Sequence, residues 1–544
     1  MFNIDRIRPM LILAVGLFGL SAIAVGGSEL AVQQKHQRNI QAMKKQDTPL
    51  KPAAALQPAP VLGSKWLDAD IETLQNAMSA GELTSYKLTE LYLARIHKYN
   101  QVDIALNAVQ TINQNALKLA TELDAERQAN GPRSPLHGIP VLVKDNYETS
   151  TMPTSAGSIL FAEHQPKRDA TLVSRLQDAG AVLLGKTTMH EFAYGITTQG
   201  SMFGSAKNPY ALTRNPGGSS GGSGAAVAAN FATFAMGSDT CGSIRIPAAQ
   251  NNLVGLRGTQ GLSSRAGIVP LSSTQDIGGP LARSVKDVAY VLDATVGFDA
   301  KDTQTAESVG QIPTSYVAAL ETVADARIGI LRSAMQQDAA DSMVAGVVED
   351  ALSQLHERAN WQLVELASPA VDESLNRPFS GHFVLIHDFA RDIDAYLSAN
   401  PSLGFRNLQE LIADGRVHSS VLASMQASAA MDKSSESTYL AELAQRSVVR
   451  QALLSLMAEH DLDALAYPTI RQIAAPIGEE QMGTNCRLSA NSGLPAISVP
   501  AGFVEGVPVG LELLAPAWSE QKLLNLAYTV EQLYPQRVPP RSIP

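Results

Sequence analysis

The chain has 544 residues, of which 45% are hydrophobic, and its formal net charge at pH 7 is −10. This composition excludes a disordered or fibrous chain, and the acidic balance argues against a nucleic-acid partner. The only two cysteines, Cys241 and Cys486, are too few for a disulfide framework, and neither belongs to a zinc-binding pattern.

Residues 1–30 have the pattern of an export segment. Arg6 and Arg8 precede an uncharged run from Leu11 to Gly27. The run is slightly long for the apolar core of a signal peptide and slightly short for a membrane span, so cleavage and retention as a membrane anchor both stay open. A buried helix would show a polar face, which this run lacks. We therefore expect an exported protein that is either periplasmic or anchored to the membrane by this segment.

Residues 31–64 are rich in Gln, Lys, Ala and Pro and predict an extended linker. The folded body follows at 65–538. We expect a single domain there, because no second linker of comparable composition interrupts the body.

Helical and strand-like segments alternate along the body. Helical periodicity follows the capping residues Thr84 and Ser85, a second helical pattern ends at Gly180, and Ser519–Tyr534 is amphipathic. The strand-like runs are 139–143, 181–184, 231–236, 462–467, 496–500 and 509–514. Because these runs are almost continuously apolar, they predict an α/β fold whose central sheet is covered on both faces. The region 310–450 is mainly helical in pattern, and it either shapes a pocket or pads the core.

Two short motifs suggest functions that their surroundings contradict. GAVLLGKT (180–187) matches the phosphate-binding loop pattern, but its four central residues are themselves a strand. GGSSG (217–221) matches the nucleophile elbow of the α/β-hydrolases, but the preceding KNPYALTRNP contains two prolines and no strand. The ten histidines form no HExxH motif, so a catalytic metal has no support.

A lysine and a serine remain as candidates for chemistry. Lys144 ends the apolar run GIPVLVK, where a lysine extends to solvent, pairs with a carboxylate such as Asp145, or acts in catalysis. Ser243 lies in GSDTCGSIRIPA just after a predicted strand, where a turn can expose consecutive amides. The glycines of GGSSGGSG (217–224) indicate a site, because they permit backbone conformations and close approaches that a Cβ forbids.

Several blocks together resemble the amidase signature family. They are LHGIPVLVKDN (136–146), GAVLLGKT (180–187), NPGGSSGGSGAAVAA (215–229), GSDTCGSIRIPA (237–248), NNLVGLRGTQG (251–261) and NSGLPAISVPAGF (491–503). The resemblance extends over roughly 65–536, with the blocks in the family's order. It implies the amidase signature fold, a large mixed central β-sheet covered by helices on both faces, and no cofactor or metal.

The resemblance also implies a Ser-Ser-Lys catalytic triad of Lys144, Ser219 and Ser243. In the family, the bridging serine follows a cis peptide, which here is Gly218–Ser219. Lys144 can act as a base only when neutral, and burial would lower its pKa from the ordinary value of about 10.4. We therefore expect activity to rise toward alkaline pH.

The remaining site residues are assigned by the same resemblance. The backbone amides expected to form the oxyanion hole are those of Thr240, Cys241, Gly242 and Ser243. The residues expected to orient this loop are Ser220, Asp239 and Arg245. The residues expected to line the substrate pocket are Gly217, Gly218, Phe192, Tyr194, Met202 and Cys486. For any one of the last four, packing in the core is the alternative that stays open. Cys241 departs from the family pattern, in which glycine is commoner. If Cys241 needed a positive φ, the loop would be strained, and its amide rather than its thiol fits the expected role.

The function implied is hydrolysis of a carboxylic acid amide, with a small-molecule amide as substrate and release of ammonia or an amine. Two alternatives stay open. One is an ammonia-donating protein like the A subunit of glutamyl-tRNA amidotransferase, against which the export segment argues. The other is a catalytically silent binding protein, against which the complete triad argues.

Overall fold

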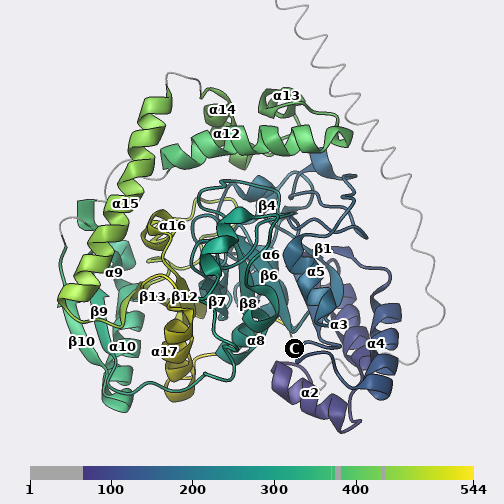
Figure 1. Cartoon of the computed structure of the whole chain (residues 1–544), viewed down its shortest axis with the longest axis horizontal. Helices are drawn as coiled ribbons and strands as arrows, with labels where there is room; N and C mark the ends of the chain where they lie inside the picture. Colours follow the sequence, from purple (N-terminus) through teal and green to yellow (C-terminus); the bar gives the residue numbers. More distant parts are fainter. Residues whose placement is uncertain (1–64, 369–370, 374–381, 432–434, 544) are drawn as a thin grey trace, which may run out of the picture. The chain divides into compact units, whose positions relative to one another are not determined.

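An eleven-stranded mixed sheet forms the centre of the protein (Figure 1). The computed structural model describes residues 65–368, 371–373, 382–431 and 435–543. The strand order is β1-β3-β2-β6-β8-β7-β12-β13-β11-β9-β10. The strands of this sheet are β1 (Val109–Ile112), β2 (Pro140–Lys144), β3 (Val182–Thr187), β6 (Phe234–Asp239), β7 (Val254–Arg257), β8 (Ile277–Ala282), β9 (Arg327–Leu331), β10 (Gln362–Leu366), β11 (Ala464–Pro468), β12 (Ala496–Val504) and β13 (Val507–Leu514).

The continuous apolar runs of the sequence form the interior strands, which confirms the predicted α/β class. Every residue of β2, β3 and β6 is buried, so these strands are covered on both faces. The strand predicted at 231–236 is displaced, and β6 instead runs from Phe234 to Asp239. A separate two-stranded ribbon pairs β4 (Gln199–Gly200) with β5 (Gly204–Ser205).

Helices cover the sheet and contact its central strands. The helix α6 packs on β6, α8 on β8, and α10 and α17 on β12. The helices are α2 (Ile71–Ser79), α3 (Ser85–Tyr99), α4 (Ala116–Asn130), α5 (Thr171–Asp178), α6 (Gly221–Ala228), α7 (Arg245–Gln250), α8 (Val285–Thr295), α9 (Arg332–Met335), α10 (Ser342–Ala359), α12 (His382–Ala399), α13 (Leu408–Ala413), α14 (Ser419–Ala429), α15 (Glu436–Glu459), α16 (Arg487–Ser492) and α17 (Glu520–Leu533).

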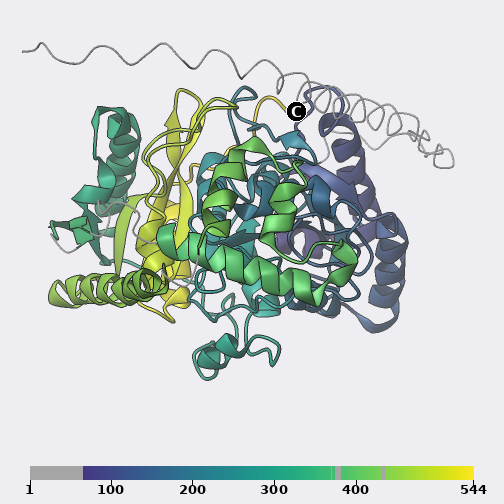
Figure 2. The same cartoon turned by 90° about the horizontal axis from the view of Figure 1, so that it is seen from above.

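The region 310–450 is mainly helical, as predicted, but it also supplies two strands that the sequence pattern did not reveal. β9 and β10 pair in parallel at one end of the sheet. The helices α12, α13 and α14 pack on one another at the top of Figure 1, and Figure 2 shows them in front of the blue and teal segments. Their apolar residues form a second core cluster with Ala156, Leu160, Phe161, Met189, Phe192, Ala193, Tyr194, Val269 and Leu271.

The predicted export segment (1–30) and linker (31–64) lie outside the described residues. Among the helices of the described chain, none is long and apolar enough to cross a membrane.

Candidate active site

The carboxyl ends of two neighbouring parallel strands, β2 and β6, carry the predicted catalytic segments. Val143 of β2 pairs with Met236 of β6, so the strands end at the same edge of the sheet. Lys144 is the last residue of β2, and Asp239 is the last residue of β6. This edge is where ligands bind in open α/β sheets, because the following loops meet there.

The glycine-rich segment places Ser219 at this edge. Helix α6 begins at Gly221 and is entirely buried. A Cβ at Gly222 would lie 2.2 Å from the carbonyl oxygen of Thr188, so only glycine allows the helix to approach so closely. The Gly218–Ser219 peptide is cis, as expected. The backbone N–H of His190 donates to the carbonyl of Ser219 at 3.0 Å, which helps to hold the serine in place.

Lys144 is fully buried and faces two serine hydroxyls. Its Nζ lies 2.7 Å from the Oγ of Ser219 and 2.9 Å from the Oγ of Ser238. The amide of Asn146 donates to the same Ser238 hydroxyl at 2.9 Å. Burial lowers the pKa of Lys144 to about 7, although the negative charges of Asp276 and Asp239 oppose the shift. A large fraction of this amine is therefore neutral near pH 7 and able to accept a proton.

Lys144 takes neither of its ordinary alternatives, solvent or a carboxylate partner. The Asp145 carboxylate instead pairs with Lys186, at 3.1 Å between Oδ1 and Nζ, and both side chains are fully buried. Lys186 comes from the GAVLLGKT run, which forms strand β3 as predicted. This run is therefore part of the sheet, which agrees with rejecting a phosphate-binding loop.

Ser243 lies in the loop between β6 and α7, and only 3% of its surface is exposed. The backbone N–H of Ser220 donates to the carbonyl of Ser243 at 3.3 Å, which brings the two serine segments into contact. The positive φ of this loop falls on Gly242 (+86°) and not on Cys241, so the cysteine adds no strain.

The four amides predicted for the oxyanion hole differ in their surroundings. The N–H of Gly242 donates to the Oδ1 of Asp239 at 2.7 Å, so the protein itself already uses this donor. Within the described chain, the amides of Thr240, Cys241 and Ser243 have no hydrogen-bond acceptor. Thr240 and Ser243 are buried and Cys241 is half-buried. Because buried amides otherwise find a partner, these three donors stay available for a bound group.

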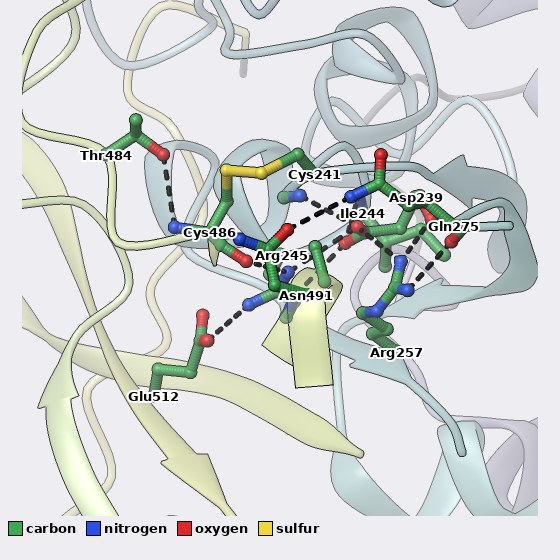
Figure 3. Close-up of a disulfide and its surroundings, with 12 residues drawn as sticks. Asp239, Cys241, Ile244, Arg245, Arg257, Gln275, Thr484, Cys486, Asn491 and Glu512 are labelled. Carbon is green, nitrogen blue, oxygen red and sulfur yellow. Dashed lines mark hydrogen bonds and ion pairs between the residues drawn. A yellow bond between two sulfur atoms is a disulfide. The ribbon is translucent and has the colours of Figure 1, made fainter. Parts of the chain in front are cut away.

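A buried charge cluster supports this loop (Figure 3). Asp239 accepts from Arg245 Nε at 3.1 Å, from Arg257 Nη1 at 2.9 Å and from the backbone N–H of Ile244 at 3.2 Å. Burial would raise the pKa of Asp239, but the two guanidinium groups outweigh it and hold the pKa well below its usual range. Asp239 therefore stays ionised and fixes the backbone on either side of Ser243.

The comparisons with known proteins agree with this geometry. The family described as Amidase matches residues 87–524. The chain belongs to the amidase signature family.

The relatives of this chain include both amidotransferase subunits and amidases. The A subunit of the glutamyl-tRNA(Gln) amidotransferase of Pseudomonas aeruginosa is 35% identical over 491 residues, covering 85% of this chain and 96% of the relative. A peptide amidase from Stenotrophomonas maltophilia has 37% identity and a TM-score of 0.82, covering 88% of this chain and 99% of the other. The corresponding amidotransferase protein of Thermotoga maritima has 26% identity and a TM-score of 0.69, covering 87% and 98%. The chain is thus an amidase or amidotransferase enzyme.

Four residues near the candidate site were not identified in the sequence analysis. Ser238 contacts Lys144, Arg257 contacts Asp239, and the Oδ1 of Asp276 accepts from the Thr240 hydroxyl at 2.5 Å. Glu512, on β13, accepts from Nη1 of Arg245. Ser238 could have been found in the sequence, because it is a polar residue at the end of a buried apolar strand. Glu512 could not, because only the order of strands in the sheet brings it to Arg245.

The residues predicted to line the pocket occupy several environments. Phe192 and Tyr194 are buried in the second core cluster, where each packs against Phe389 of α12. Met202 is half-buried, and Gly217 and Gly218 are buried. For Phe192 and Tyr194 the structure shows packing against the helices of the 310–450 region, so a role as pocket lining stays a prediction.

The two cysteines of the chain form a disulfide, Cys241–Cys486, which the sequence analysis did not predict. Cys486 therefore does not present a free side chain to a pocket. Because the sulfur of Cys241 is bonded, it is also no thiol nucleophile in this structure.

Ser220 is the remaining residue that was expected to orient the loop. Its hydroxyl donates to the carbonyl of Ser238 at 3.2 Å.

Proposed function

We propose that the protein hydrolyses carboxylic acid amides through a serine acyl-enzyme and releases ammonia or an amine. The observation that carries the proposal is the buried Lys144, whose Nζ lies 2.7 Å from the Ser219 hydroxyl at the edge where Ser243 also lies. A serine hydroxyl needs a base, and a lysine whose pKa burial lowers can supply one.

In the proposed reaction the Oγ of Ser243 attacks the amide carbonyl carbon. Its proton passes to Ser219, whose own proton passes to the neutral amine of Lys144. When the tetrahedral intermediate collapses, the C–N bond breaks and the proton returns through Ser219 to the leaving nitrogen. Water then attacks the acyl-enzyme ester by the same proton route and releases the carboxylic acid.

The negative oxygen of the intermediate needs donors that are already in place. We assign this role to the amides of Thr240, Cys241 and Ser243, which have no acceptor among the described residues. Loss of one such donor typically lowers kcat by about 10²–10³-fold. The Gly242 amide contributes indirectly, because its bond to Asp239 fixes the loop.

Ammonia release from a panel of peptide, aliphatic and aryl amides tests the proposal. We place peptide amides first, because of the 37% identity to a peptide amidase. A fluorophosphonate that reacts with activated serines should label the wild type and not Ser243→Ala, which should also lose turnover. Labelling or turnover that survives in Ser243→Ala would refute the assignment.

A second candidate is an ammonia-donating component of an amidotransferase, which the 35% identity to the Pseudomonas aeruginosa protein favours. Such a protein would purify from its native cell with partner subunits and require them for product formation. A binding protein without catalysis is a third candidate, against which the complete triad argues. Turnover by the purified single chain would support the hydrolase over both.

We also propose that the protein is exported. The arginine-preceded apolar run of residues 1–30 supports this proposal. The disulfide adds support, because disulfides persist mainly in oxidising compartments. Cell fractionation with N-terminal sequencing tests it and separates a cleaved signal peptide from a membrane anchor. Recovery of the native protein in the cytosol with residue 1 intact would contradict export.

A further inference from the structure

The disulfide between Cys241 and Cys486 lies in the loop that carries the proposed oxyanion donors (Figure 3). Cys241 precedes Ser243 by two residues, and its backbone N–H is one of the three amides without an acceptor in the described chain. The disulfide therefore joins a proposed oxyanion donor to a segment 245 residues further along the chain.

The neighbours of Cys241 in this loop are fixed by hydrogen bonds. The Thr240 hydroxyl donates to Asp276 at 2.5 Å, and the N–H groups of Gly242 and Ile244 donate to Asp239 at 2.7 and 3.2 Å. Cys241 itself makes no hydrogen bond to any residue that the structure describes. The disulfide is therefore its direct tether.

The other end of the disulfide is a well-held anchor. Cys486 precedes α16, is 5% exposed, and donates its N–H to the Thr484 hydroxyl at 3.2 Å. Its carbonyl accepts from the N–H of Ala490 at 3.1 Å and from Arg245 Nη2 at 3.5 Å. Since Arg245 also binds Asp239, the anchor and the charge cluster beneath the loop are connected. A bond to this anchor consequently fixes where Cys241 lies.

We propose that the Cys241–Cys486 disulfide is a positioning element of the active site, and that full amidase activity requires the oxidised protein. This inference rests on the proposed function. A dithiol supplies two electrons and two protons, so the S–S bond breaks into two thiols and the dithiol closes to its own cyclic disulfide. Cys241 is then no longer held by a covalent bond to Cys486, and its backbone N–H is no longer fixed in position to donate to the developing oxyanion. Because that contact forms in the transition state, the loss falls on kcat rather than on KM.

The experiment measures kcat and KM for an amide substrate before and after dithiothreitol. The protein has only two cysteines, so the reagent has a single disulfide to reduce. We expect kcat to fall by about tenfold with little change in KM, a smaller loss than the roughly 10²–10³-fold typical of deleting a donor. Reoxidation with oxidised glutathione should restore kcat. A Cys486→Ser variant should have the low kcat at once and no response to dithiothreitol, and Cys241→Ala/Cys486→Ala is its matched control without thiols.

The labelling rate of Ser243 by a fluorophosphonate gives a second measurement, and it should slow in parallel with kcat. Two free thiols in the unreduced, denatured protein would overturn the inference, because the disulfide would be absent. A fall in thermal stability with kcat unchanged, in the reduced protein or in Cys486→Ser, would also overturn it and leave a purely structural bond. Turnover that survives in Ser243→Ala would refute the proposed function instead, whatever the response to dithiothreitol.

Discussion

The lowered pKa of Lys144 makes the pH dependence of turnover the sharpest test of the site. Burial lowers this pKa from 10.5 to about 7. At pH 6 roughly one lysine in ten would then be neutral, and at pH 8 roughly nine in ten. An ordinary exposed lysine would be neutral in only roughly one molecule in 3,000 at pH 7. If the neutral amine is the base, kcat/KM should rise about tenfold from pH 6 to a plateau above pH 8.

The assay is ammonia release between pH 5.5 and 10 at constant ionic strength, with circular dichroism confirming that the protein stays folded. Lys144→Arg is the control, because arginine stays charged throughout this range. Its turnover should be lower at every pH and lack the inflection near pH 7. A wild-type profile that is flat from pH 6 to 8 and beyond would refute a neutral Lys144 as the base. A profile that rises only near pH 10 would refute the lowered pKa.

The same pKa predicts how stability depends on pH. The folded-state pKa lies below the unfolded value, so between pH 7 and 10.5 the unfolded chain binds more protons and stability rises with pH. The lowered pKa of Lys144 therefore reduces the free energy of unfolding by about 4 kcal/mol at pH 7, and this reduction becomes smaller by about 2 kcal/mol at pH 9. The stability difference between Lys144→Met and wild type, from urea unfolding, should shift by that amount between the two pH values. An unchanged difference would mean that the lysine titrates alike in both states.

Four further substitutions test the relay and the core. Ser219→Ala should lower kcat by roughly 10²–10⁴-fold, because it removes the only hydroxyl proposed to carry the proton between Ser243 and Lys144; a change under about threefold would contradict the relay. Lys186→Met should destabilise the fold by about 3–5 kcal/mol in urea unfolding, because it leaves the buried Asp145 carboxylate unpaired. Adding Asp145→Asn should recover part of that loss. Trp361→Ala should cost about 3–5 kcal/mol through the cavity that it leaves in a fully buried position, with kcat unchanged once the protein is folded.

The parts of the fold that could be predicted are those whose signal lies within one short segment. The apolar runs at 139–143 and 181–184 became β2 and β3 because strands buried on both faces carry few polar residues. β10 was missed because it lies at the sheet's end and its residues are mostly partly exposed, so its sequence shows no such run. β9 is buried from Ile328 to Leu331, so it carried the same kind of apolar signal, and it was missed because the region around it is mainly helical in pattern.

The candidate site divides in the same way. Lys144, Ser219 and Ser243 each lie within a motif that can be read locally, and their separate segments meet at one sheet edge. Glu512 lies in no such motif. It contacts Arg245 only because β12 and β13 follow β7 in the order of the sheet. The disulfide could not be predicted for the same reason. Its cysteines are 245 residues apart in the sequence, and they come into contact only because the fold brings the segment before α16 to the loop of Cys241. Nothing in the sequence around the two cysteines indicates that they lie close together in the fold.

Lys144 and Lys186 have different interaction partners because side chains alternate between the two faces of a sheet along each strand. In the parallel pairing of β2 with β3, Lys186 lies opposite Val143, and Lys144 lies opposite Thr187. Successive residues face opposite sides of a sheet, so Lys186 shares the side of Val143, and Asp145, two residues on, continues on that side. The carboxylate therefore meets Lys186 and not the lysine next to it in sequence. Lys144 is left on the other side, where its Nζ contacts the hydroxyls of Ser219 and Ser238 and the carbonyl of Ser238. No carboxylate of the described residues pairs with it, which is the condition for a buried lysine to act as a base.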